Sequence, residues 1–265
     1  MTLQLTTQNY HSNEANQQYM SVSQYKDFMN CEARAMARLH GWREPESDAL
    51  LIGSYVHAHF EGTLEQFKDE HPELISSRGP TKGELKSDYL KANIMIEAIE
   101  KDEFCMFVLQ GQKEILIQAD MFGVTWKAKL DVYAPDQDRI ADLKTVKSIR
   151  EKVWDPNYGY VSFVEGYGYI IQMAVYTELE RRYTNRDRWL EPLIVAVSKE
   201  DVPDKEIISF DEHRLKYELE IVERNMPRIL DVKQGIQPPK RCDKCRYCRE
   251  TKKVTKITHF MDLIV

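Results

Sequence analysis

The sequence lacks the features of a membrane or secreted protein. No run approaches the roughly 18 consecutive apolar residues that a membrane-spanning helix needs. The first residues, MTLQLTTQNYHSNE, do not show the basic-then-apolar pattern of a secretion signal. Only five cysteines are present, and three of them crowd together near the C-terminus, which is not a disulfide framework. We therefore expect a cytoplasmic protein with no membrane partner.

An overall basic excess is also missing. The chain carries 37 Lys and Arg against 43 Asp and Glu, a net charge of −6, which argues against a protein that coats nucleic acid nonspecifically. Positive charge is local instead: residues 240–256 hold eight basic and two acidic residues. This segment is either a phosphate-contacting patch, with Arg246 and Arg249 as candidate DNA contacts, or a solvated tail.

The sequence is long enough for one large core. Its 265 residues are 42% hydrophobic. We expect a flexible polar segment over 1–20, a folded domain over 21–239, and a basic, Cys-rich segment over 240–265 that packs back on the domain. Apolar spacing predicts helices at 23–41, 49–70, 87–101, 167–183 and 211–235, a loop at 71–90, and strands at 114–119, 124–132, 139–145 and 192–198. This order describes an α/β (α+β) fold with a central mixed sheet flanked by helices.

Two of these strands form the hairpin on which the functional reading depends. The turn Ala134-Pro135-Asp136-Gln137-Asp138 joins a strand ending near Asp131 to one carrying Asp142 and Lys144, two apart and so on one face. If the hairpin closes in register, two carboxylates and an ammonium converge. Close carboxylates repel unless a cation lies between them, and Mg²⁺ suits such oxygen ligands. The alternative is a surface hairpin with ordinary ion pairs.

The predicted helix 49–70 carries a possible further ligand. His57 and Glu61 are four apart and share a face, whereas His59 points roughly the opposite way. They could complete a metal site or simply bridge helices. Gly53, one turn earlier, suggests a close backbone approach. Glu114, at the start of a predicted strand, could face the metal patch or solvent, and we expect solvent.

Taken in order, these pieces resemble a known family. The segments GSYVHAHFEG, LD at 130–131, DLK at 142–144 and QMAVY at 172–176 are similar to motifs of the PD-(D/E)XK nuclease superfamily. The similarity is greatest to the RecE-type phage recombination exonucleases, with the RecB nuclease domain more distant. The resemblance implies catalytic and metal-binding roles for the following residues: Asp131, Asp142, the carbonyl of Leu143, Lys144 and His57, with Glu61 close by. It also implies that Gln172 and Tyr176 contact DNA near the scissile end.

The resemblance carries further implications. It implies a restriction-endonuclease-like core and Mg²⁺-dependent (or Mn²⁺-dependent) digestion of double-stranded DNA ends from 5′ to 3′, leaving a 3′ single strand. It also implies that the protein forms a homo-oligomeric ring and has a RecT-like single-strand annealing protein as partner. The expected location is the cytoplasm of the bacterial host of a phage or prophage. These properties follow from likeness and not from composition or spacing.

The cysteines suggest a second metal centre. Cys242, Cys245 and Cys248 form Cys-x2-Cys-x2-Cys, a spacing that suits an iron–sulfur cluster better than a zinc ribbon, with Cys31 as the candidate fourth ligand. Nucleases of the AddB and CRISPR-adaptation types look similar, with one cysteine before the core and three after it. A [4Fe–4S] cluster, Zn²⁺ and free thiols all remain open, and Cys105 is expected to be a core thiol.

Two other functions therefore stand beside the recombination exonuclease. The first is an iron–sulfur PD-(D/E)XK nuclease that acts on single strands or flaps. The second is a catalytically inactive DNA-binding module with a zinc site. The intact Asp131, Asp142 and Lys144 argue against the second, because a binding protein gains nothing by holding like charges together.

Overall fold

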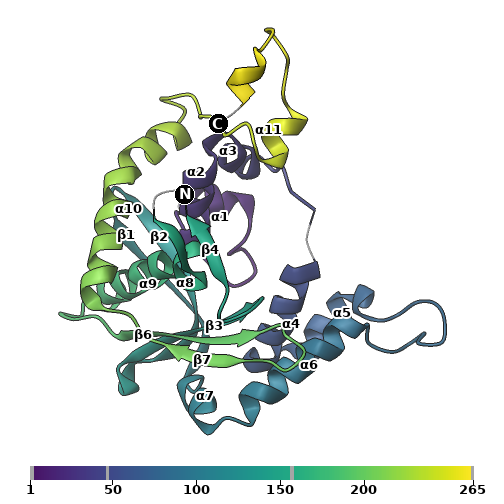
Figure 1. Ribbon diagram of the computed structural model, residues 1–265. Coiled ribbons are helices and arrows are strands. Elements are labelled where there is room, and N and C mark those ends of the chain that lie inside the picture. Colours follow the sequence, from purple (N-terminus) through teal and green to yellow (C-terminus); the bar gives the residue numbers. More distant parts are fainter. Residues whose placement is uncertain (1–2, 46–47, 156–157, 264–265) are drawn as a thin grey trace.

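The computed structural model describes residues 3–45, 48–155 and 158–263 (Figure 1). Its helices are α1 (Asn13–Gln18), α2 (Val22–Asn30), α3 (Glu32–Leu39), α4 (Asp48–Glu61), α5 (Leu64–Glu70), α6 (Ser87–Glu100), α7 (Glu103–Val108), α8 (Phe163–Gly166), α9 (Tyr169–Thr184), α10 (Glu212–Lys233) and α11 (Arg246–Glu250), with short 3-10 turns at Pro72–Leu74, Pro135–Gln137 and Phe260–Leu263. Its strands are β1 (Gln112–Met121), β2 (Val124–Ala134), β3 (Arg139–Val146), β4 (Lys152–Asp155), β5 (Gly159–Ser162), β6 (Glu191–Ser198) and β7 (Lys205–Ile208).

A mixed sheet lies at the centre, in the order β1-β2-β3-β6-β7. The pairs β1–β2, β2–β3 and β6–β7 are antiparallel, and β3–β6 is parallel because the chain crosses over through α9 between them. The predicted hairpin is present, and its turn ends at Asp138 in the left-handed conformation. The expected fold class, a mixed sheet flanked by helices, is confirmed.

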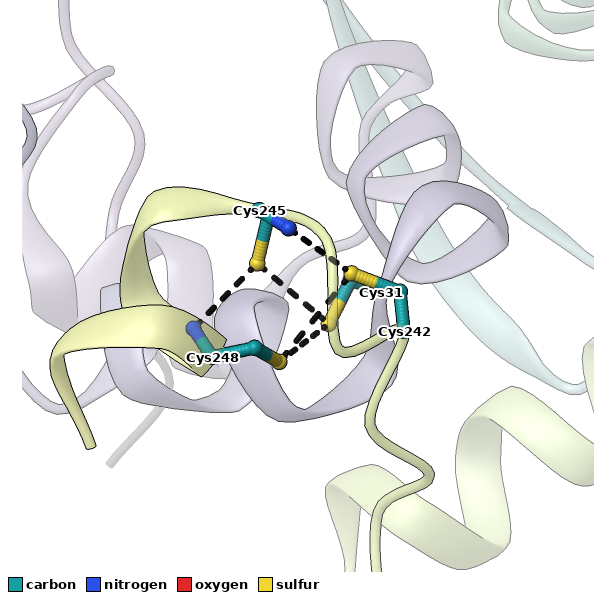
Figure 2. A group of neighbouring side chains, drawn as sticks. All are labelled: Cys31, Cys242, Cys245 and Cys248. Atoms are coloured by element: carbon teal, nitrogen blue, oxygen red, sulfur yellow. Dashed lines mark hydrogen bonds between the residues drawn. The ribbon is translucent and has the colours of Figure 1, made fainter. Parts of the chain in front are cut away.

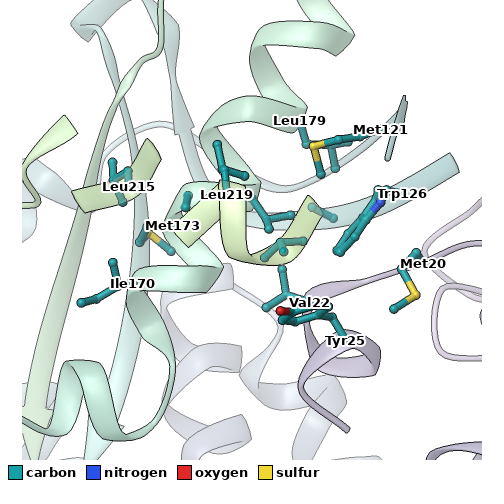
Figure 3. Packing of buried hydrophobic residues seen from close by; sticks show 14 of the residues in the cluster. Met20, Val22, Tyr25, Met121, Trp126, Ile170, Met173, Leu179, Leu215 and Leu219 are labelled. Carbon is teal, nitrogen blue, oxygen red and sulfur yellow. The ribbon is translucent and has the colours of Figure 1, made fainter. Parts of the chain in front are cut away.

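Helices cover both faces of the sheet. Strand β6 shows why, because alternate side chains enter different cores: Ile194 and Ala196 pack with α2, α9 and α10, whereas Val195 and Val197 pack with α4, α6 and α7. Figure 3 shows side chains of the first core, among them Val22 and Tyr25 of α2, Met173 of α9 and Trp126 of β2. None of the described helices is long and apolar enough to cross a bilayer.

The N-terminal segment, for which we expected flexibility, contains a helix and buried side chains. Within residues 3–20, α1 is capped by Ser12, and Tyr19 and Met20 are buried. The main chain of Met20 accepts a hydrogen bond from Lys127 N and donates one to Thr125 O, so the segment adds a bridge to the edge of β2. A few apolar side chains and one edge bridge outweigh the polar composition; residues 1–2 lie outside the described part.

Other differences concern element boundaries. The predicted helix 23–41 is two helices, capped by Ser21 and broken where Cys31 adopts extended backbone. The predicted helix 49–70 breaks at Gly62, whose φ of +79° is left-handed. Helix α10 runs through Pro227, and helix α6 begins at Ser87 as expected. Helix α7, which contains the buried core thiol Cys105, and the short strands β4, β5 and β7 were not predicted from the sequence.

Candidate active site

Strands β2 and β3 part where the two hairpin acids lie. Their last pair is Val132 with Ala141, so the same register would set Asp131 opposite Asp142. The ladder stops there. Instead, Oδ2 of Asp131 accepts a hydrogen bond from the main-chain N–H of Leu143 at 2.9 Å. The side chain of Asp131 thus takes the place of a strand carbonyl and keeps both acids on one patch.

Asp142 is the buried centre of this patch, with its side chain 3% exposed. Its Oδ1 accepts a hydrogen bond of 2.7 Å from Nε2 of Gln172, and its Oδ2 lies 2.5 Å from Nζ of Lys144. Burial, followed by the charge of Asp131, raises the pKa of Asp142 to about 6. Burial lowers the pKa of Lys144, but the negative charges of Asp142 and Asp131 have the larger effect, and the pKa of this ammonium is raised. The site therefore favours a proton or a cation between its carboxylates.

His57 reaches the patch from α4. Its Nδ1 lies 3.5 Å from Oδ2 of Asp131 and 3.9 Å from Oε1 of Glu61. His59 faces away and pairs with Glu100 at 2.7 Å, as the helical period predicts. Helix α4 comes close to β3 at Gly53, where an added Cβ would lie 3.1 Å from Oγ1 of Thr145.

Glu114 faces the site, contrary to the preference for solvent. It adopts a left-handed backbone, φ 56°, at the β1 position across from Asp131, where the β1–β2 pairing skips one residue. Its carboxylate forms an ion pair with Lys129. Burial, followed by the charge of Glu114, raises the pKa of Glu61 to about 7. A non-glycine residue in this conformation is uncommon and concentrates at functional sites, and period-2 reasoning cannot foresee the resulting change of face.

Gln172 and Tyr176 lie on the face of α9 that covers Asp142. Gln172 is buried and donates to Asp142, so its observed contact is with the acid. Burial raises the pKa of Tyr176 well above its usual value. Contact of either side chain with DNA remains a prediction. Tyr169, whose ring centre is 5.3 Å from Nζ of Lys144, was not among the predicted site residues.

The four expected cysteines meet elsewhere, where Cys31 at the start of α3 faces Cys242, Cys245 and the α11 residue Cys248 (Figure 2). Their Sγ atoms all lie within 4.8 Å of one another. The separations are 3.6 Å for Cys31–Cys248, 3.9 Å for Cys31–Cys245 and 4.0 Å for Cys242–Cys248. Burial opposes the thiolate of Cys242, but the main-chain N–H groups of Cys245 and Lys244 lower its pKa to about 6. The first and last parts of the chain are thus joined through four thiols that can hold a metal.

The basic residues near this cluster lie on its outer side. Arg246 and Arg249 are exposed on α11, and Arg246 pairs with Glu250 at 2.5 Å. Arg241 lies over the ring of Tyr247 at 5.9 Å. A DNA contact by Arg246 or Arg249 remains a prediction.

Comparison with known proteins agrees with this geometry. Residues 21–251 match the family model described as a PDDEXK-like domain of unknown function, DUF3799. The chain belongs to this PDDEXK-like family. It is 42% identical to the crystal structure described as a “Putative exonuclease” from Eubacterium rectale, over 99% of both chains, with a TM-score of 0.93. A second structure, SSO0001, is 14% identical over 85% of this chain and 91% of its own, with a TM-score of 0.32. No curated protein matches the chain.

The donor set of this PDDEXK-like site fits the divalent cation that such nucleases typically use. Asp131, Asp142 and the Leu143 carbonyl offer hard oxygen ligands, which Mg²⁺ prefers, and His57 adds a nitrogen. Among the described residues, the buried Oδ2 of Asp142 accepts no well-aligned hydrogen bond, although the Lys144 ammonium lies beside it. An oxygen in this state can accept a metal ion without losing a hydrogen bond.

Proposed function

We propose that the protein is a Mg²⁺-dependent exonuclease that digests the ends of linear double-stranded DNA. The observation that carries the proposal is the convergence of Asp131, Asp142 and Lys144 on one patch, with His57 3.5 Å from Asp131. A nuclease of the PDDEXK-like family is the activity that this arrangement supports best.

The residues would divide the work as follows. Asp131 and Asp142 would hold the cation, and the Leu143 carbonyl and His57 could supply further ligands. A bound Mg²⁺ would supply Lewis-acid polarisation of the scissile phosphate and would make a water molecule more acidic. Lys144 orients the attacking water and screens the negative charge that develops on the phosphoryl group. Gln172 holds Asp142 in place through its 2.7 Å hydrogen bond.

The finer parts of the proposal rest on resemblance to the RecE-type exonucleases. These parts are digestion from 5′ to 3′, a 3′ tail passed to a RecT-like annealing protein, and a homo-oligomeric ring around the duplex. Support comes from the order of the four motifs, GSYVHAHFEG, LD, DLK and QMAVY.

A linear duplex labelled at a single 5′ or 3′ end tests the activity and its polarity together. We expect Mg²⁺-dependent release of the 5′ label as mononucleotide while the 3′ label stays on a long strand. Asp142→Ala and Lys144→Ala should each abolish release and leave the fold intact. Nicked circles and single strands as parallel substrates distinguish an end-dependent exonuclease from the single-strand or flap nuclease. Appreciable cleavage by Asp142→Ala would refute the assignment.

For the four cysteines we propose one tetrahedral Zn²⁺ in place of the [4Fe–4S] cluster that their spacing suggested. Four thiolates about 2.3 Å from one Zn²⁺ stand roughly 3.8 Å from each other. Three of the sulfur pairs lie 3.6, 3.9 and 4.0 Å apart, and all four sulfur atoms lie within 4.8 Å of one another. In a cubane each thiolate binds a different iron, so the sulfur atoms must lie farther apart. Purified protein should be colourless and contain one zinc per chain by elemental analysis; a brown protein with iron would overturn this proposal.

A further inference from the structure

Helix α2 brings a second lysine to the reaction centre. Nζ of Lys26 donates a 2.9 Å hydrogen bond to the carbonyl of Tyr167 and lies 5.6 Å from the ring centre of Tyr169. Nζ of Lys144 lies 5.3 Å from the centre of the same ring. Two ammonium groups, one from α2 and one from β3, therefore approach a single aromatic side chain beside the carboxylates.

Lys26 has no counter-ion of its own among the described residues. The two acids whose charges act on it are both engaged: Asp142 with Lys144, and Asp27 with Arg34 and Arg38. Burial, followed by the charge of Lys144, lowers the pKa of Lys26 to about 8. A half-buried ammonium without a carboxylate is costly, and an anion from outside would relieve that cost.

The turn before α9 is shaped to hold this lysine. Gly168 has φ +67°, and a Cβ there would lie 3.1 Å from Cδ of Lys26, so the aliphatic stem packs against the bare backbone. Gly168 is also the N-cap of the 16-residue helix α9 and offers no side chain to cap its first N–H groups. These N–H groups add positive potential to the corner that already holds Lys26.

We propose that Lys26 binds the backbone phosphate adjacent to the scissile phosphate, through one of its non-bridging oxygens. This inference rests on the nuclease function proposed above, because the reaction centre of Lys144 and Asp142 defines the scissile position. Lys144 pairs with Asp142, whereas Lys26 is held at the α8–α9 turn and has no carboxylate within ion-pair distance in the described parts of the chain. The chemistry that suits such a group is a phosphodiester anion.

The test measures DNA binding and not cleavage. Binding of an end-labelled duplex is titrated in Ca²⁺, which supports binding without positioning the water, over a range of salt concentrations. Lys26→Met should weaken binding about tenfold or more, as expected for a lost charged hydrogen bond. The slope of log binding constant against log salt concentration (the salt slope) should decrease in magnitude by about 0.9. Lys26→Arg should keep the wild-type slope. The matched control is Lys216→Met, since Lys216 lies 5.9 Å from the ring of Trp189 and pairs with Glu212.

A purely structural role for Lys26 predicts the opposite pattern. If Lys26 only satisfies the Tyr167 carbonyl, Lys26→Met should lower the melting temperature and leave affinity and salt slope unchanged, which would overturn the inference. Should Lys26→Met fail to fold, Lys26→Gln retains an N–H donor without the charge, and an unchanged slope in that variant is equally decisive. Wild-type protein that binds DNA but never cleaves it would refute the proposed function, while the slope still decides the role of Lys26.

Discussion

Oδ2 of Asp131 accepts the main-chain N–H of Leu143 at 2.9 Å, so a catalytic candidate is also part of the β2–β3 connection. The same oxygen lies 3.5 Å from Nδ1 of His57. One carboxylate thus links two strands and a helix at the point where the strands separate. This oxygen atom is therefore both a candidate metal ligand and a hydrogen-bond acceptor that connects β2 to β3.

Asp131→Ala should therefore cost stability as well as activity. It leaves the N–H of Leu143 without its acceptor, and an unsatisfied N–H of this kind costs about 1–3 kcal/mol. Asp131→Asn keeps a side-chain oxygen and should cost less, while both variants lose cleavage. Urea denaturation of the two variants measures the difference. Equal stability of wild type and Asp131→Ala would show that water replaces the carboxylate.

His57→Ala and His59→Ala form a matched pair on one helix. His57 faces Asp131, whereas His59 pairs with Glu100 on the other side of α4. We expect His57→Ala to lower Mg²⁺ affinity or the cleavage rate by about 10-fold or more, as for other residues around a metal, and His59→Ala to leave both unchanged. Cleavage rates over a Mg²⁺ titration give the comparison. A neutral His57→Ala would leave this histidine with a structural role only.

Binding of Mg²⁺ should strengthen as pH rises through about 6. Burial and the charge of Asp131 raise the pKa of Asp142 to about 6 in the folded protein. Protonation of Asp142 therefore stabilises the metal-free fold at pH values below the pKa of this group in the unfolded chain. This stabilisation is lost as the pH rises through about 6. The cation needs the deprotonated form. The melting-temperature increase caused by Mg²⁺ should be small near pH 5 and large near pH 8. Asp142→Asn should remove most of this pH dependence; an equal increase at both pH values contradicts the assignment.

Gly53→Ala should not stabilise the protein, although alanine has a higher helix propensity than glycine. Replacing Gly by Ala in a helix typically stabilises it by about 1 kcal/mol, but this Cβ would lie 3.1 Å from Oγ1 of Thr145. In a Thr145→Ala background the gain should return, which gives a coupling of about 0.5–1 kcal/mol in a double-mutant cycle. Thermal denaturation of the four proteins measures it. Additive effects would mean that α4 does not rest on β3 at this position.

The parts of the site that follow a regular period could be predicted from the sequence. Asp142 and Lys144 share a face because residues two apart in a strand point the same way. His57 and His59 point in different directions because residues two apart in a helix do not share a face. Glu114 could not be placed, since its left-handed backbone interrupts the alternation. Lys26 could not be found either, because its partner Tyr167 is 141 residues away. The bridge that pairs the N-terminal segment with β2, from Met20 to Trp126, likewise joins residues far apart in the sequence.

The thiol cluster has a consequence for biosynthesis. Cys31 and Cys248 are 217 residues apart in the chain, yet their sulfur atoms lie 3.6 Å from each other. At about 5–20 residues per second, a ribosome needs roughly 10–40 s to travel that far. During this interval Cys31 is without its three partner cysteines. Binding of the proposed metal can therefore be completed only after Cys248 has been made, and a shorter chain would lack this link between the start of α3 and residues 242–248.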